Sequence, residues 1–317
     1  MFRKLIIINL LILSLLSCSE KPSNVIRIGI LDGPSAVSFI QLIDKQTVLN
    51  GKKVEIIMKS EPQQIQALMM RNELDFAILP TVMAANLYNK GVHFKIVSIP
   101  IWGTLYVMTN KNDSASYTQL NSKTIGVFGQ GATPDILLQG FIKYNNLQNV
   151  KISYNFTTNN DIAQALLQKK INYAVVSEPL VSSLLFRDKN ISIVSPLNFE
   201  NFISNTNVDI FAQTAFLINE NFMKENDRHV IKQLINLYTN SCDFVNENPE
   251  EAAKLLVKHR IVSKIEVARL SLPLCNIRYR GAFAVEDELM RYLRIFYEYN
   301  PKSIGGKIPN RNIIYQP

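Results

Sequence analysis

The sequence predicts an α/β fold built as two lobes with parallel-rich mixed sheets. Short apolar runs rich in Val and Ile alternate with stretches of about ten residues that have helical periodicity. This alternation occurs twice along the chain, and the polar stretch Lys111–Ser116 separates the two blocks. A length of 317 residues with 47% hydrophobic and 19% charged residues suits two globular domains of roughly 100 to 200 residues each.

The first block opens with a strand, a turn and a helix. Val25–Leu31 is an apolar run typical of a strand buried on both faces, and Asp32, Gly33 and Pro34 end it because Pro lacks the N–H that a ladder needs. Ser35 is a candidate cap for the next helix. Such a turn aims backbone N–H groups at the carboxyl end of a strand, where open α/β sheets bind ligands. An ordinary strand-turn-helix without a ligand is the alternative.

The rest of the first block continues this alternation. The expected strands are Lys53–Met58, Leu74–Leu79 and Phe94–Ile99. The expected helices begin at Pro62 and span Val82–Tyr88. Pro80 and Thr81 follow the third strand directly, so they join the candidate ligand-binding loops.

The second block has the same pattern, and then the chain returns to the first. Gly103–Asn110 is extended, and further strands are expected at Thr124–Phe128, Val150–Phe156, Tyr173–Ser177 and Ile191–Val194. Helices are expected at Asp135–Tyr144, Ile162–Gln168 and Leu180–Phe186. After a polar stretch at Asn198–Asn207, the extended run Ile210–Ile218 crosses back. Helices then dominate, at Phe222–Val245, Pro249–Lys258, Ile265–Leu270 and Asp287–Tyr297, before a loop-like tail from Lys302. We expect residues 25–108 with 208–317 to form lobe 1 and residues 109–207 to form lobe 2.

The N-terminus carries an export signal. Arg3 and Lys4 precede an apolar run, Leu5–Leu16, that is too short to span a bilayer comfortably. Leu15–Cys18 resembles the lipobox of bacterial lipoproteins, so residues 1–17 are expected to be removed, Cys18 to be lipidated, and residues 18–24 to act as a tether. A plain signal peptide with an incidental Cys is the alternative. The protein is therefore expected outside the cytoplasm, held on a membrane by its lipid anchor.

The net charge and the cysteine content limit the kinds of molecule that the protein is expected to bind and the state of its cysteines. Removing residues 1–17 takes away two basic side chains and no acidic one, which leaves a formal charge of +6. That excess suits an anionic small ligand or membrane surface, or simply a solvated surface. No basic run with interleaved aromatics suggests nucleic acid. Cys242 and Cys275 could pair outside the cytoplasm or lie buried as small hydrophobic residues.

Further residues are candidates for ligand contact. The loop Gly129–Pro134 lacks the Lys-Ser/Thr of a P-loop but allows close backbone approach to a small ligand, with Gln130, Gly131, Ala132 and Thr133 in reach. Glu178 ends a strand and faces a cleft, or else only favours the dipole of the next helix. Trp102, the single tryptophan, either stacks on a ligand or packs between the lobes.

The sequence shows no catalytic or metal-binding constellation. The three histidines are far apart, and no Gly-x-Ser-x-Gly elbow is present. We therefore expect no enzymatic activity, no cofactor and no metal.

Five segments in order resemble a known family: IRIGILDGPSAVSF, ALMMRNELDFAILPT, AANLYNKGVHFKIVS, LNSKTIGVFGQGATPD and ALLQKKINYAVVSEPL. They are similar to the nitrate/sulfonate/taurine and thiamine-precursor (NMT1/THI5-like) solute-binding proteins of ABC importers. The resemblance implies a type II periplasmic-binding fold, with two lobes joined by two crossing strands and ligand held in the cleft. It also implies ligand contacts from the loops named above, so the candidate site comprises Asp32, Gly33, Pro34, Ser35, Pro80, Thr81, Trp102, Gln130, Gly131, Ala132, Thr133 and Glu178.

The function implied is that of a lipid-anchored substrate-binding component, expected as a monomer, with ABC permease and ATPase subunits as partners. Its ligand would be a small polar or anionic molecule such as a sulfonate, nitrate or a thiamine/pyrimidine precursor. Trp102 or Phe128 would stack on any ring. An enzyme on the same fold, similar to chorismate dehydratases, and a sensory lipoprotein or adhesin are the alternatives.

Overall fold

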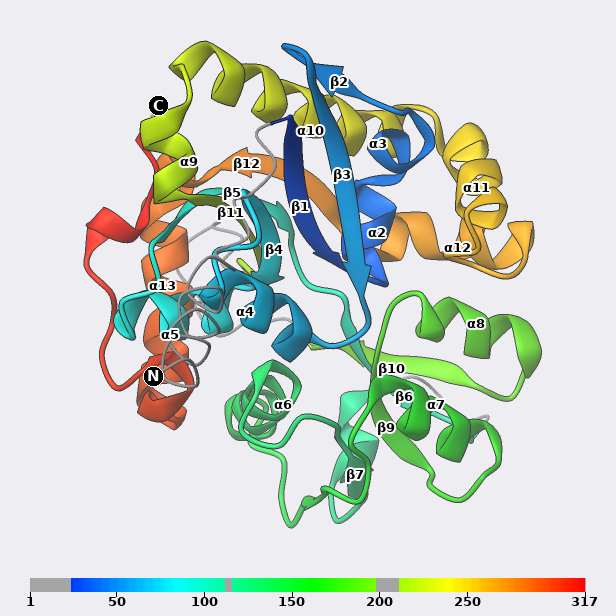
Figure 1. Ribbon diagram of the computed structural model, residues 1–317. Helices are drawn as coiled ribbons and strands as arrows, with labels where there is room; N and C mark the ends of the chain where they lie inside the picture. Colours follow the sequence, from blue (N-terminus) through cyan, green and yellow to red (C-terminus); the bar gives the residue numbers. More distant parts are fainter. Residues whose placement is uncertain (1–23, 112–115, 198–210, 317) are drawn as a thin grey trace, which may run out of the picture.

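The computed structural model describes residues 24–111, 116–197 and 211–316. The signal peptide, Cys18 and most of the tether, as well as the polar stretch Asn198–Asn207, lie outside the described residues. Two separate sheets with helices around them form the molecule (Figure 1). The predicted α/β fold with two mixed sheets is thus confirmed. We call the seven-stranded sheet with its helices lobe 1 and the five-stranded sheet with its helices lobe 2.

Lobe 1 is built on a mixed sheet. Its strands are β1 (Val25–Leu31), β2 (Val48–Leu49), β3 (Lys52–Lys59), β4 (Phe76–Pro80), β5 (Phe94–Ile101), β11 (Thr214–Asn219) and β12 (Ile277–Gly281). They lie in the order β12-β5-β11-β4-β1-β3-β2, with β1 parallel to both β3 and β4. β11 runs antiparallel between β4 and β5. The carboxyl ends of β1, β3 and β4 therefore meet at one edge of the sheet, where the sequence predicts the ligand-binding loops.

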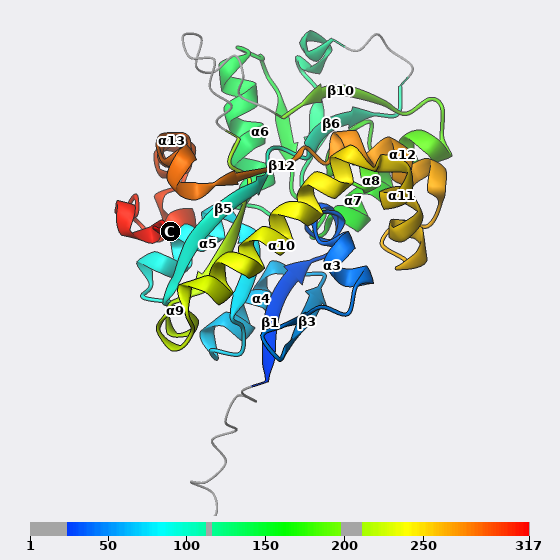
Figure 2. The same ribbon diagram turned by 90° about the horizontal axis from the view of Figure 1, so that it is seen from above.

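Helices cover both faces of this sheet (Figure 2). One face packs on α2 (Pro34–Ser38), α3 (Ile40–Asp44), α10 (Arg228–Glu247), α11 (Pro249–Lys258) and α12 (Ile265–Leu274). The other packs on α4 (Pro62–Met70), α5 (Thr81–Asn89) and α13 (Glu286–Tyr299). On β1, Ile26, Ile28 and Ile30 lie on the first of these faces and are fully buried, while on the opposite face Gly29 packs against Leu74 and Ile65. Aromatic rings fill the first face, where Phe39 stacks on Tyr238 at 4.1 Å between centroids.

Lobe 2 is a smaller version of the same plan. Its strands are β6 (Leu105–Thr109), β7 (Thr124–Gly126), β8 (Lys151–Ser153), β9 (Tyr173–Ser177) and β10 (Ser192–Pro196), in the order β10-β6-β9-β7-β8. Its helices are α6 (Thr133–Tyr144), α7 (Asn159–Leu167) and α8 (Leu180–Arg187), with a 3₁₀ turn at Tyr117–Leu120. β6 pairs with β9 and β10, so this sheet takes in residues that we placed at the end of lobe 1. The lobe boundaries themselves stay a prediction.

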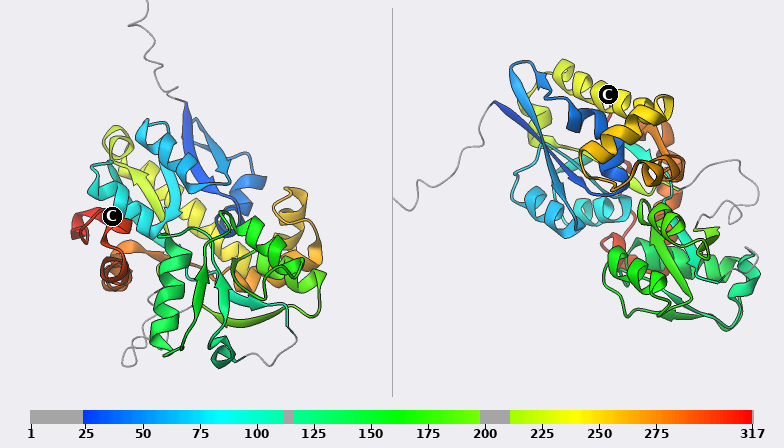
Figure 3. Two further views of the ribbon diagram at one scale, coloured as in Figure 1. Left: turned by 90° about the horizontal axis from the view of Figure 1, so that it is seen from below. Right: turned by 90° about the vertical axis from the view of Figure 1, so that its right-hand side faces the viewer.

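Two segments that cross between the lobes are fastened to each other. The first, Trp102–Thr104, links β5 to β6, and the second leads into β11 and contains Gln213. The Gln213 side chain accepts a hydrogen bond from the Thr104 amide at 2.8 Å and donates one to Thr104 Oγ1 at 2.9 Å. The right-hand view of Figure 3 shows the two lobes one above the other.

Local details differ from the expectations. Gly33, not Ser35, is the N-cap of α2, because Pro34 already takes the first helical position. The predicted helix Phe222–Val245 is two helices, α9 (Glu220–Glu225) and α10, since Asp227 caps α10 by accepting from the His229 amide. The strands β2 and β12 were not predicted. Cys242 and Cys275 are both buried and unpaired, as the second reading of these residues expected.

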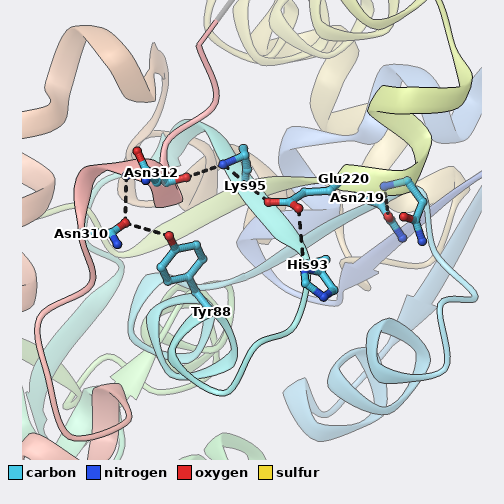
Figure 4. A network of polar contacts seen from close by, with 8 residues as sticks. Tyr88, His93, Lys95, Asn219, Glu220, Asn310 and Asn312 are labelled. Carbon is cyan, nitrogen blue, oxygen red and sulfur yellow. Dashed lines mark hydrogen bonds and ion pairs between the residues drawn. The ribbon is translucent and has the colours of Figure 1, made fainter.

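The C-terminal tail is held against lobe 1 rather than being a simple loop (Figure 4). Tyr88 donates a hydrogen bond to Asn310 Oδ1 at 2.7 Å, and Lys95 Nζ donates one to the carbonyl oxygen of Asn312 at 2.5 Å. Lys95 also pairs with Glu220 at 3.5 Å, and His93 lies 3.6 Å from the same carboxylate. These contacts join the C-terminal tail to α5 and β5, and Glu220 of α9 pairs with the same lysine. Within the described ranges, no helix is both long and apolar enough to span a bilayer.

Candidate functional site

A cleft of about 630 Å³ lies between the two lobes, at the strand ends that the sequence singled out. Lobe 1 lines it with Leu31–Ser35, Ser60–Gln63 and the start of α5. Lobe 2 lines it with the glycine loop before α6, with Thr157–Asn160 and with Ser177–Leu180. Thr104 and Gln213, on the crossing segments, also belong to the lining. The cleft is thus enclosed by both sheets and by the connection between them.

Most of the predicted site residues come together here. Nine of them line the cleft: Asp32, Gly33, Pro34, Ser35, Pro80, Gly131, Ala132, Thr133 and Glu178. Thr81 does not, because it is fully buried at the start of α5, where its amide donates to the carbonyl oxygen of Gln213. Gln130 also stands outside the lining, as an exposed residue at the tip of its loop.

Trp102 lies outside the cleft as well, contrary to the expectation that it stacks on a ligand. Its side chain is only 4% exposed. The indole Nε1 donates hydrogen bonds to the carbonyl oxygens of Ile99, at 3.0 Å, and Arg278, at 2.8 Å. The guanidinium groups of Arg278 and Arg280 lie over the ring, at 5.2 and 5.3 Å from its centroid. The ring therefore packs within the protein, which was the alternative reading.

A buried carboxylate that sequence reasoning missed holds the glycine loop. Asp135, in the first turn of α6, is 2% exposed. Its Oδ2 accepts from the Gly131 amide at 2.8 Å, while Oδ1 accepts from Gln139 at 2.9 Å and from the Tyr154 hydroxyl at 3.0 Å. Burial, followed by the hydrogen bond to Asp135, raises the pKa of Tyr154 to about 12. The signal that could have pointed to Asp135 is its position in the sequence GATPD, where an acidic residue falls in the first turn of the helix that follows the loop.

Glu178 is a second buried carboxyl group at the cleft. It is 1% exposed, and its Oε1 accepts a hydrogen bond from Ser182 at 2.9 Å. No described group donates a hydrogen bond to Oε2. Burial raises the pKa of Glu178 to about 8, and the Ser182 hydrogen bond opposes this only in part. The carboxyl group is therefore mostly protonated at neutral pH.

Polar side chains along the bottom of the cleft form a continuous chain. Thr104 Oγ1 lies 3.0 Å from Ser177 Oγ. Asn159 accepts a hydrogen bond from the Ser177 amide at 3.0 Å and donates one to the Ser177 carbonyl oxygen at 3.2 Å. Together with Gln213, these groups link the crossing segments to β9 and α7. Sequence reasoning did not find them, since Thr, Ser and Asn at strand ends are common and carry no spacing pattern.

The two lobes touch at both ends of the cleft. A Cβ at Gly33 would lie 3.4 Å from the carbonyl oxygen of Glu178 and 3.7 Å from the Pro179 ring. At the other end, Asn300, which follows α13, donates from Nδ2 to the Gly131 carbonyl oxygen at 3.3 Å. The lobes are thus close together in this structure, with the cleft between two contacts.

Four titratable side chains line the cleft. Asp32, Glu61 and Glu178 are acidic, and Lys90 is basic. Partial burial, followed by repulsion from Glu61, raises the pKa of Asp32. Within the part of the chain that the structure describes, no three His, Cys, Asp or Glu residues are placed to hold a metal ion.

Two α/β lobes joined by crossing segments, with a polar cleft between them, are the architecture of the periplasmic-binding-protein fold. The chain belongs to the NMT1/THI5-like family, whose model matches residues 49–252. A crystal structure of an ABC transporter protein from Parabacteroides distasonis is 33% identical, with a TM-score of 0.81, and the match covers 93% of this chain and 99% of that one.

Two more distant structures share the fold. The periplasmic aliphatic sulphonate-binding protein SsuA from Escherichia coli is 15% identical, with a TM-score of 0.72 over 93% of this chain and 92% of that one. The periplasmic nitrate-binding protein NrtA from Synechocystis is 10% identical, with a TM-score of 0.62 over 89% and 84%. No curated protein sequence matches the chain. The predicted family and fold are therefore confirmed, and the chain fits the solute-binding component of an ABC import system.

Proposed function

We propose that this protein captures a small polar molecule in the interlobe cleft and delivers it to the permease and ATPase subunits of an ABC importer. The observation that carries the proposal is the position of the Asp32–Ser35 loop on one wall and the Gly131–Thr133 loop on the other, across a cleft of about 630 Å³. Sulfonates, nitrate and thiamine or pyrimidine precursors are the starting candidates. They come from the family description and from the names of the two distant relatives.

Binding would use groups from both lobes at once. The ligand contacts that we propose are the nine predicted residues that line the cleft, with Phe128 as an apolar surface for any ring. Because each lobe supplies only part of these contacts, the ligand favours the state in which the lobes are together. Thr81, Gln130 and Trp102 are left out of this set because they stand outside the lining.

The cellular setting follows from the N-terminal sequence. We propose that Cys18 is lipidated after residues 1–17 are removed, so that the protein works as a monomer outside the cytoplasm, tethered to a membrane. One acyl chain binds a membrane only marginally, whereas several hold firmly, so full lipidation would decide whether the protein stays attached. No catalytic role and no cofactor are part of the proposal.

Isothermal titration calorimetry of the purified protein tests the binding proposal. The probes are ethanesulfonate, nitrate and a hydroxymethyl-aminopyrimidine, each recovered afterwards and analysed by mass spectrometry. Saturable binding of an unchanged probe is the expected result, and chemical conversion of a probe would instead favour an enzyme.

Mass spectrometry of the mature N-terminus tests the anchor separately. A triacylated or diacylated Cys18 is expected. A free N-terminus at any other residue would rule the lipoprotein out.

A further inference from the structure

Acidic side chains outnumber basic ones in the lining of the cleft, and this excess bears on the class of ligand. Among the described lining residues, three carry carboxyl groups, and Lys90 is the one basic residue. Lys90 is exposed and caps the C-terminal end of α5. No arginine and no histidine is part of that lining. A permanently anionic solute would therefore meet more negative than positive side chains.

Three of the helices that begin at the cleft, α4, α6 and α7, carry acidic residues at their N-termini, whereas the first turns of α2, α5 and α8 hold none. Helix N-termini normally favour anions. In the first three helices, however, the chain supplies its own acids, with Glu61 at the N-cap of α4, Asp135 in the first turn of α6 and Asp161 in the first turn of α7. Asp135 already accepts the Gly131 amide, at 2.8 Å, that a ligand anion would otherwise use. The positive ends of these three helices are thus partly neutralised before any ligand arrives.

Two of the carboxyl groups lie on loops that touch each other. Asp32 precedes Gly33, whose Cα faces the Glu178 carbonyl oxygen and the Pro179 ring. The Asp32 carboxyl receives no hydrogen bond and no ion pair from any described residue, and its nearest charged influence is the like charge of Glu61. On the other loop, Glu178 is 1% exposed and its Oε2 has no donor within the described ranges. Carboxyl groups with an oxygen that lacks a described partner therefore belong to both loops at this end of the cleft.

We propose that the solute carries a protonated nitrogen group, such as an ammonium, an amidinium or a protonated ring nitrogen, and that this group binds at the end of the cleft where the Asp32 and Glu178 loops meet. Charge-assisted hydrogen bonds to carboxylates are among the stronger polar contacts in proteins, and a cation relieves the repulsion between Asp32 and Glu61. This inference rests on the proposed function and narrows it, since it disfavours sulfonates and nitrate.

A matched panel of probes tests the ligand class. Choline, putrescine and agmatine provide cations, and ethanesulfonate and nitrate provide anions, each titrated by calorimetry at pH 7. We expect at least one cation to bind and the affinity to fall about tenfold or more in Asp32→Asn, because a hydrogen bond to a charged partner is lost. Glu61→Gln should weaken binding less. Asp243→Asn, an exposed acid on α10 that does not line the cleft, is the matched control and should bind as the wild type does.

A proton-linkage measurement gives an independent readout. A cation beside Glu178 lowers the pKa of that carboxyl group, so binding at pH 7 should release protons. Titrations in two buffers of different ionisation enthalpy would show this release, and Glu178→Gln should abolish it. If anions bind while cations do not, the inference is wrong and the proposed function stands. If no probe of either sign binds, both are contradicted.

Discussion

The carboxylate of Asp135 accepts a hydrogen bond from the amide of Gly131, 2.8 Å from Oδ2 to N, and so fixes the glycine loop of lobe 2 at the edge of the cleft. The same carboxylate accepts from Gln139 and Tyr154, so one buried group orients both the loop and the start of α6. A loop made mostly of small residues thereby gains a defined shape.

Asp135→Ala should therefore weaken both stability and ligand binding. The substitution leaves the Gly131 amide and the Tyr154 hydroxyl without their acceptor, which should lower the free energy of unfolding by about 2–4 kcal/mol. Tyr154→Phe removes a single hydrogen bond and should cost about 1 kcal/mol with the loop unchanged. Urea unfolding followed by circular dichroism measures both. Equal stability of the two variants would contradict the role assigned to Asp135.

Glu178 should make the protein less stable as the pH rises. Its pKa is about 8 in the folded protein and near 4.5 when unfolded. Between these values the folded state holds a proton that the unfolded state has released, so the free energy of unfolding falls by up to about 1.4 kcal/mol per pH unit. The fall should begin near pH 4.5 and level off above pH 8.

Glu178→Gln, which keeps the shape but cannot ionise, should lack this contribution. Urea unfolding from pH 5 to 8.5 gives the difference between wild type and variant, in which the other titrating groups cancel. A difference that stays constant over this range would show that the carboxyl group is not held in its protonated form.

Gly33→Ala should weaken ligand binding, because Gly33 lines the cleft beside the Glu178 loop. Gly33 has φ of 76°, which costs an alanine about 1–2 kcal/mol, and a new methyl group would stand 3.4 Å from the Glu178 carbonyl oxygen. Gly51→Ala is the matched control, because Gly51 has φ of 77° and nothing within 4 Å of its Cβ position. Both variants should lose similar stability, and only Gly33→Ala should lose ligand affinity in calorimetry. A loss of affinity in both would point to a general effect of destabilisation.

Trp102→Phe should reduce stability without affecting binding. The change removes the two hydrogen bonds that the indole donates to Ile99 and Arg278, at an expected cost of about 1–3 kcal/mol. Ligand affinity, measured below the unfolding transition, should stay within twofold of the wild type. A selective loss of affinity would restore the ligand-stacking role that the structure does not support.

Most strands and helices could be predicted from the sequence, because hydrophobic periodicity and the Gly and Pro residues that end an element are local signals. Val25–Leu31 and Tyr173–Ser177 are strands with the predicted bounds, since apolar runs ended by Asp-Gly-Pro or Glu-Pro allow little else. β12 was missed because IRYRG is half polar, and its place in the sheet depends on pairing with the distant β5. The break between α9 and α10 depends on Asp227 as the N-cap of α10. It was missed because Asp227 lies within a longer stretch of helical periodicity.

The candidate site was predicted where it depends on the backbone and missed where it depends on side-chain contacts. Loops at strand ends gave nine lining residues, because the topology of an α/β sheet decides where those ends meet. The Gln213–Thr104 pair joins residues 109 positions apart, which no local pattern could indicate. For the same reason the sequence could not decide between the two readings of Trp102, since the arginines that cover its ring come from the distant strand β12.

The position of Trp102 also has a practical use. It is the single tryptophan of the chain, and it lies on the first of the two segments that connect the lobes. Any rotation of lobe 2 against lobe 1 turns the backbone of that segment beside the indole ring, which Ile99, Arg278 and Arg280 hold on the lobe 1 side. Intrinsic fluorescence therefore offers a label-free signal of opening and closing, with a single emitter whose surroundings are already known.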